Sequence, residues 1–139
     1  MNFFDKLLGR SDIHFNDDIY MRRWRIIHTR YFGIRVHNIM RSDMDVELHD
    51  HPFTFVSFIL RGGYFEITPD GLRTWYGPGS LVVRSGAALH RLELDRPAWT
   101  LVFRGPMTRV WGFLTSSGWV PWSKFVVECN GDDHRRVQK

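Results

Sequence analysis

Hydrophobic and polar positions alternate along most of the chain in short segments, and glycine and proline separate these segments. The pattern predicts strands at residues 23–28, 32–40, 46–51, 53–60, 64–68, 72–76, 80–84, 88–94, 99–104 and 109–115. Short strands with this punctuation are typical of an all-β sandwich or barrel. The intervals between them leave no room for the crossover helices of a βαβ fold.

The two ends of the chain have a different pattern. Phe3, Phe4, Leu7 and Leu8 lie at helical spacing and predict a short amphipathic helix. The polar segment 11–18 is interpreted as a connector. We therefore divide the chain into a helix and connector at residues 1–20, a barrel at 21–128 and a flexible tail at 129–139. The tryptophans of segment 118–122 are expected to fold back across the barrel or to lie in a dimer interface.

Composition indicates one folded domain with a basic surface. The 139 residues are 43% hydrophobic and 15% aromatic, and the formal net charge is +4. Arginine supplies most of the positive charge, which suits a small anionic ligand because the guanidinium matches a carboxylate or phosphate. The basic residues are scattered among acidic ones and form no nucleic-acid-binding motif, so we expect no nucleic-acid partner.

The number of cysteines and the length of the hydrophobic segments indicate the cellular compartment. Cys129 is the only cysteine, which excludes an intrachain disulfide and a multi-cysteine metal site. The N-terminal stretch lacks the pattern of a signal peptide, and no apolar run approaches the roughly 20 residues of a membrane helix. We expect a cytoplasmic protein with no membrane partner.

Three of the seven histidines have a spacing that suggests a metal site. His49 and His51 are two residues apart in a predicted strand, so both imidazoles project from the same face while Asp50 points away. His90, from a neighbouring strand, would supply a third ligand. Imidazole nitrogens suit iron, zinc, copper and nickel, and manganese less strongly. The alternative is a surface pair of histidines on an edge strand.

These residues resemble the two motifs of the cupin superfamily. The His49-Asp50-His51 pair followed by Gly62 is similar to the first motif, and Gly79 followed by His90 is similar to the second. The resemblance implies a cupin-type double-stranded β-helix, a jelly-roll barrel. It also implies one divalent metal ion held by the three histidines, with iron favoured over nickel, manganese or zinc.

The chain departs from the family pattern at one ligand position. Phe55 stands where the family places a glutamate ligand, and Ser85 and Ala87 replace the proline and the last glycine of the second motif. Losing the carboxylate leaves three neutral imidazoles, as in the thiol dioxygenases of the superfamily. The same loss also accompanies non-catalytic members.

Further candidates surround this expected centre. Glu47 shares strand parity with His49, and Tyr64 follows a glycine turn, so either residue could serve as the acid or base. Arg104, Arg109 and Trp111 could form a wall that binds the carboxylate and the apolar part of a substrate. Alternatively, both arginines are solvated at a hairpin. His37 lies on a predicted strand with Arg35 and Ile39 at the same parity, and it is expected to face the barrel interior.

The leading hypothesis is a metal-dependent oxygenase acting on a small organic acid or thiol, assembled as a homodimer. One alternative is a non-catalytic cupin that binds a small ligand or has a structural role. Another is a metal-independent sugar isomerase or epimerase. The reaction class in each case rests on what the resemblance implies.

Overall fold

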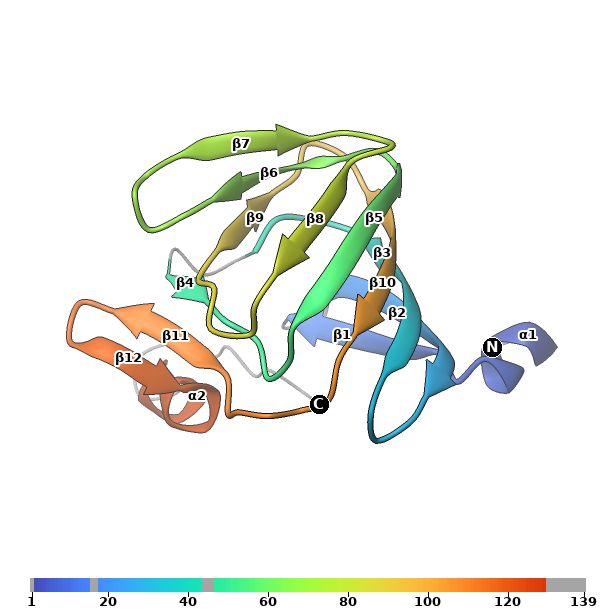
Figure 1. The fold of residues 1–139 in the computed structure, drawn as a ribbon, viewed down its shortest axis with the longest axis horizontal. Coiled ribbons are helices and arrows are strands. Elements are labelled where there is room, and N and C mark those ends of the chain that lie inside the picture. Colours follow the sequence, from blue (N-terminus) through green and yellow to red (C-terminus); the bar gives the residue numbers. More distant parts are fainter. Residues whose placement is uncertain (1, 16–17, 44–46, 130–139) are drawn as a thin grey trace.

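The computed structural model describes residues 2–15, 18–43 and 47–129, and shows twelve strands and two short helices in that part of the chain (Figure 1). The helices are α1 (Phe3–Leu7) and α2 (Trp122–Cys129). The strands are β1 (Ser11–Phe15), β2 (Asp18–His28), β3 (Gly33–Ile39), β4 (Leu48–His49), β5 (Phe55–Arg61), β6 (Tyr64–Ile67), β7 (Arg73–Tyr76), β8 (Leu81–Arg84), β9 (Arg91–Glu93), β10 (Ala98–Arg104), β11 (Gly112–Thr115) and β12 (Gly118–Pro121).

The strands form three sheets in which every neighbouring pair is antiparallel. The large sheet has the order β1-β2-β3-β10-β5-β8, and the two small sheets have the orders β12-β11-β4 and β7-β6-β9. Figure 1 shows the large sheet as one wall, with the small sheets arranged around the opposite side. An isolated bridge between His49 and His90 connects the two small sheets. The predicted all-β class is therefore confirmed.

The inward face of the large sheet changes character along its strands. Residues two apart on a strand share a face. Ile39 of β3 lies in the core, so His37 and Arg35 on the same strand also point toward the interior. The apolar end of this interior is filled by the core residues Tyr20, Ile39, Ile59, Tyr64, Val82, Leu92 and Ala98. The other end carries polar side chains, and the candidate site lies there.

Several predicted boundaries are wrong, and two of the differences are large. The expected connector contains β1, which pairs with β2 from Ser11↔Arg23 to Phe15↔Asp18. This strand lies at the edge of the sheet, where polar side chains remain partly solvated and still satisfy the ladder. Of the predicted strand at 46–51, residue 46 lies outside the described residues, and within 47–51 only Leu48–His49 forms a strand.

Helix α2 was not predicted from the hydrophobic pattern. Trp122 and Phe125 share a face of this helix and pack on the segment around β11. The ring of Phe125 stacks on Phe113 at 4.0 Å, and Trp122 stacks on Trp111 at 6.1 Å. The tryptophan segment therefore folds back onto the barrel, as expected. Neither described helix has the length and hydropathy needed to cross a bilayer.

Candidate metal centre

Backbone pairing brings the three candidate histidines together. His49 exchanges two backbone hydrogen bonds of 2.9 Å with His90, and the His51 N–H donates to Gly86 O at 2.9 Å. A side chain at Gly86 could not fit, because its Cβ would lie 2.9 Å from His51 O. The absence of a side chain at Gly86 thus allows the two histidine segments to approach each other.

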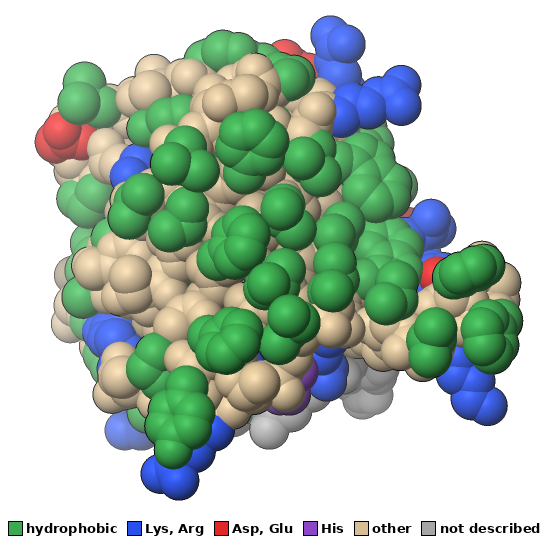
Figure 2. Space-filling view, turned by 45° about the vertical axis from the view of Figure 1, so that its right-hand side comes forward, with side chains coloured by type: hydrophobic (Ala, Val, Ile, Leu, Met, Phe, Trp, Pro, Cys, Tyr) green, Lys and Arg blue, Asp and Glu red, His purple; other side chains and the backbone are tan. Residues whose placement is uncertain are grey.

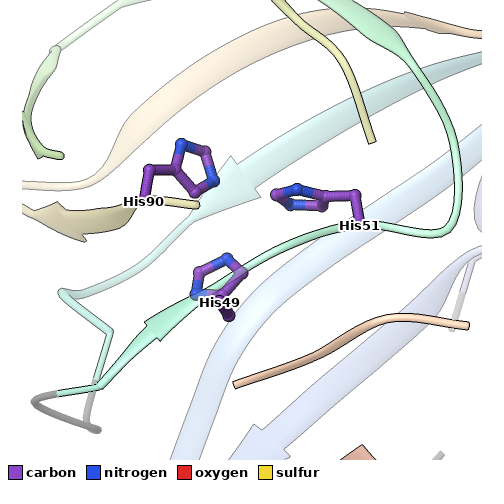
Figure 3. A group of neighbouring side chains, drawn as sticks. All are labelled: His49, His51 and His90. Carbon is purple, nitrogen blue, oxygen red and sulfur yellow. The ribbon is translucent and has the colours of Figure 1, made fainter. Parts of the chain in front are cut away.

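The three imidazoles turn toward a common centre (Figure 3). The candidate ligand atoms of His49, His51 and His90 all lie within 4.8 Å of one another, and their ring centroids are 4.9–5.1 Å apart. Burial lowers the pKa of both His49 and His51, and that of His51 falls well below its usual value. Neutral imidazole is the form that binds a metal ion, so this donor set fits a divalent cation.

An acidic side chain lies beside each of two rings, and one of them is within hydrogen-bonding distance. His90 Nδ1 lies 2.7 Å from Glu66 Oε1, and His49 Nδ1 lies 3.6 Å from Asp43 Oδ2. A proton on His90 Nδ1 donated to Glu66 leaves Nε2 free as a ligand atom, and such outer contacts fix the orientation of metal-binding histidines.

Glu66 is the centre of a buried charge network. Its carboxylate is 1% exposed and accepts hydrogen bonds from His90 and from Arg84, whose Nε lies 2.9 Å away. Burial alone would raise the pKa of Glu66, but the hydrogen bonds and charges of His90 and Arg84 together lower it to about 2. The carboxylate is therefore ionised at neutral pH and can accept the proton of the His90 ring.

Asp50 points away from the histidines, as the strand pattern predicted, and it fixes the segment that carries them. Its carboxylate accepts from Gly112 N at 2.7 Å and from Trp119 Nε1 at 2.9 Å, and it forms an ion pair of 2.7 Å with Arg109. Since Asp50 is only 2% exposed, these bonds are shielded from water. They tie the segment from His49 to His51 to β11 and β12.

Phe55 lies beside the metal centre at the position of the family's glutamate. Its ring is 8% exposed and packs edge-on against His51, with the centroids 4.8 Å apart. A phenyl ring offers no ligand atom. Among the described residues, the group that could hold a metal therefore consists of the three histidines alone.

The two predicted acid–base residues have different surroundings. Glu47 is half-buried directly before β4 and does not belong to that three-histidine group. Tyr64 is 4% exposed in the core, where burial raises its pKa to about 12. Asp45, which shares the parity of Glu47, lies outside the described residues. The catalytic roles of Glu47 and Tyr64 stay predictions.

The three predicted substrate-binding residues are divided between two regions. Arg109 pairs with Asp50 and donates to the carbonyl oxygens of His51 and Gly86 at 3.2 and 3.1 Å. Trp111 stacks with Trp122. Arg104 lies on β10 of the large sheet, 4% exposed. Their substrate contacts also stay predictions.

Sequence reasoning missed Glu66 and Asp43 as partners of the histidines. Glu66 lies two residues after the core residue Tyr64 on β6, so the two side chains share a face. This parity was a signal in the sequence that Glu66 faces inward. Asp43 lies in the segment between β3 and β4, where no periodicity marks it. Pairing across distant segments decides both contacts.

Comparison with known proteins gives similarity in structure only. No protein-family model matches the chain, and no curated protein sequence matches it. The polyketide cyclase RemF from Streptomyces resistomycificus superposes with a TM-score of 0.53 at 17% identity, over 62% of this chain and 65% of that protein, a little under two thirds of its length. KdgF from Halomonas sp. gives a TM-score of 0.55 at 15% identity, over 70% and 90% of the two chains.

A cupin superfamily protein from Desulfitobacterium hafniense DCB-2 gives a TM-score of 0.53 at 10% identity, over 62% of this chain and 77% of that one. At such identities the likeness concerns the fold and not the activity. It agrees with the resemblance seen in the two histidine motifs. The chain has the fold of the cupin superfamily, the double-stranded β-helix.

Proposed function

We propose that the protein is a metal-dependent oxygenase that acts on a small organic acid or thiol, with its metal ion held by His49, His51 and His90. The observation that carries this proposal is the convergence of three buried imidazoles whose ligand atoms lie within 4.8 Å of one another. Iron is the favoured ion, since non-haem iron oxygenases use a three-residue site that leaves other coordination positions open.

The neutral donor set favours an anionic substrate. Three imidazoles add no negative charge, so a divalent ion keeps its full charge and attracts a carboxylate or thiolate more strongly than an ion with a carboxylate ligand would. Phe55 supplies no fourth ligand and leaves that side of the centre apolar. When bound, an iron ion supplies the redox chemistry that reaction with dioxygen requires.

The chain's own residues orient the ligands. Glu66 fixes the ring of His90 and keeps its Nδ1 proton engaged, and Asp43 lies near the corresponding nitrogen of His49. Glu47 is the candidate base, because it is half-buried two residues before His49. Tyr64 is a candidate hydrogen-bond donor, since a phenol is protonated at neutral pH and burial raises its pKa further.

Reconstitution with separate metals tests this proposal. After chelator treatment and anaerobic loading, we expect the protein to retain about one equivalent of iron. We expect the iron form to consume oxygen with at least one member of a panel of small carboxylic acids and thiols. The zinc form is the control and should consume none, because zinc has no redox chemistry.

The alternatives predict different results in the same experiment. Bound iron without oxygen consumption would contradict the oxygenase and favour a binding or structural cupin, a reading that Phe55 at the glutamate position supports. It would also fit a non-redox reaction at the bound metal; one fold neighbour is named a polyketide cyclase. Isomerase or epimerase activity that persists in chelator would identify the metal-independent enzyme.

We also propose a homodimer formed through the outward face of the large sheet. Two cross-strand rows on this face are entirely apolar and extend from β2 to β8, and Figure 2 shows hydrophobic side chains gathered there. The rows are Trp24, Val36, Leu101, Phe58 and Leu81, and Ile27, Ile34, Phe103, Val56 and Val83. Sheets with such apolar rows pack on one another, and a second copy brings the same two uncharged rows.

The double variant Leu81→Glu/Phe103→Glu is expected to be monomeric, because two carboxylates on each copy would have to be buried in the interface. Leu81 and Phe103 are 61% and 43% exposed, so the substitutions leave the core of the barrel intact. Analytical ultracentrifugation measures the result. The control is Leu72→Glu/Met107→Glu, two residues that are each 61% exposed away from this face. A monomeric wild-type protein would contradict the proposal.

A further inference from the structure

The inward face of the large sheet carries arginines close to the metal centre. Arg35 on β3 is 6% exposed and pairs across the sheet with Arg25 and Val102. Arg23 pairs with His37 in the next row toward the core. Arg104, in the row on the other side, is 4% exposed. These guanidinium groups therefore share the interior face on which the barrel is polar.

Acidic partners are missing for these arginines among the described residues. The ion pairs of that part of the chain involve Arg10, Arg41, Arg73, Arg84, Arg91 and Arg109, but not Arg23, Arg35 or Arg104. Burial lowers the pKa of Arg35 to about 10, and the positive charges of Arg23, Arg104 and Arg25 add to this effect. A buried cation without a counter-charge costs stability, so a local anion would be strongly favoured.

Several hydrogen-bonding groups at this end of the barrel also lack a partner. Buried polar atoms without a hydrogen bond include Nε of Arg35, Nε2 of His37, Oγ1 of Thr100 and Nε of Arg104. His37 and Thr100 pair directly across β3 and β10, in the row next to Arg35. Buried donors are normally satisfied in a folded protein, and a ligand is one of the groups that can satisfy them.

Phe53 connects this cluster with the metal centre. The guanidinium carbons of Arg35 and Arg104 lie 5.4 and 5.8 Å from the centroid of the Phe53 ring. The same ring lies 6.3 Å from the ring of His51, centroid to centroid. A small molecule in contact with Phe53 could therefore reach the arginines at one end and the three histidines at the other.

We propose that Arg35, together with Arg23, binds the carboxylate of a small organic acid whose apolar part packs on Phe53. Arg104 adds positive charge to this site, while its terminal nitrogens donate to the carbonyl oxygens of Gly105 and Thr29. The planar guanidinium of Arg35 can donate two parallel hydrogen bonds to a carboxylate. The inference rests on the proposed function in one respect, that the other end of the same molecule would react at the metal. The carboxylate site itself requires no metal.

Ligand-induced stabilisation of the metal-free protein tests the site. The probes are acetate, benzoate and succinate, each compared with its neutral amide, and the readout is the melting temperature in chelator followed by titration calorimetry. We expect at least one carboxylate to raise the melting temperature and its amide to have no effect. We expect Arg35→Met to weaken binding of that carboxylate about tenfold or more, since a charge-assisted pair is lost.

The matched control is Arg61→Met, an exposed arginine on β5 of the same sheet, which should bind like the wild type. Without ligand, Arg35→Met should melt no lower than the wild type, because the substitution removes a buried and unpaired charge. A purely structural role for Arg35 predicts the reverse, a lower melting temperature. The proposal is overturned if no carboxylate stabilises the wild type more than its amide. The experiment does not measure turnover, so its outcome does not depend on whether the oxygenase assay succeeds.

Discussion

Substitution of His51 by alanine is expected to abolish metal binding while leaving the fold intact. Two imidazoles then remain, and the loss of affinity should exceed the roughly 10–100-fold effect that removal of an outer contact has on a metal site. His51 is the most informative of the three ligands. Its Nδ1 has no hydrogen-bond partner, so its removal breaks no other contact of that atom. His49 and His90 each contact an acidic side chain, and removing either histidine would also leave that acidic side chain without its partner.

Elemental analysis after dialysis against a weak chelator measures this effect, and a circular-dichroism melt of the same samples reports the fold. We expect about one equivalent of metal in the wild type and near none in His51→Ala, with melting curves of the metal-free proteins that nearly coincide. His14→Ala, which removes a half-buried imidazole on β1, is the control and should retain the metal. Full metal content in His51→Ala would contradict the three-histidine centre.

The substitution Glu66→Gln is expected to destabilise the metal-free protein by about 3–5 kcal/mol, because it leaves the buried side of Arg84 without its counter-charge. It should also weaken metal binding by about 10–100-fold, since the His90 ring loses the carboxylate that orients it. Urea unfolding in chelator measures the first effect, and competition with a chelator of known affinity measures the second.

Glu93→Gln is the matched control for Glu66→Gln. Like Glu66, Glu93 has two basic partners, here Arg73 and Arg91, but its side chain is 34% exposed. Solvent screens such a pair, so the expected loss is only about 0–1 kcal/mol. Equal losses in the two variants would show that the buried network of Glu66 has no special role.

The pH dependence of stability offers a second readout for Glu66. Its pKa in the folded protein is about 2, below the ordinary value of 4.5. The carboxylate therefore contributes stability that is fully present above about pH 4.5 and is lost as the pH falls from there toward 2. The difference in unfolding free energy between the wild type and Glu66→Gln should shrink across this interval.

The sequence by itself determined the features that depend on neighbouring residues. Alternation of apolar and polar residues with glycine and proline between the runs defines short strands, because side chains of a strand alternate between two faces. The same rule placed His49 and His51 together and turned Asp50 away from them. The position of Phe55 relative to the histidines, and hence the absence of the family's glutamate ligand, is also read directly from the chain.

Only the tertiary structure decided which distant side chains meet. Glu66 and His90 are joined because β6 pairs with β9, and Asp50 finds Gly112 and Trp119 because β4 pairs with β11. Strand β1 forms because it pairs with β2, and helix α2 forms because it packs on the segment around β11. The local hydrophobic pattern does not contain these contacts. The register between strands is set by the whole set of contacts, and a shift of one residue would reverse every face.

The arginine cluster shows the same limit most clearly. The chain shows that Arg35 shares parity with His37, and therefore that it faces inward with that histidine. It does not show that Arg23, Arg25, Arg35 and Arg104 come together, or that Asp50, Glu66 and Glu93 pair with other cations. The net charge at a site depends on side chains from strands that are far apart in sequence. It can therefore be determined only from the folded barrel.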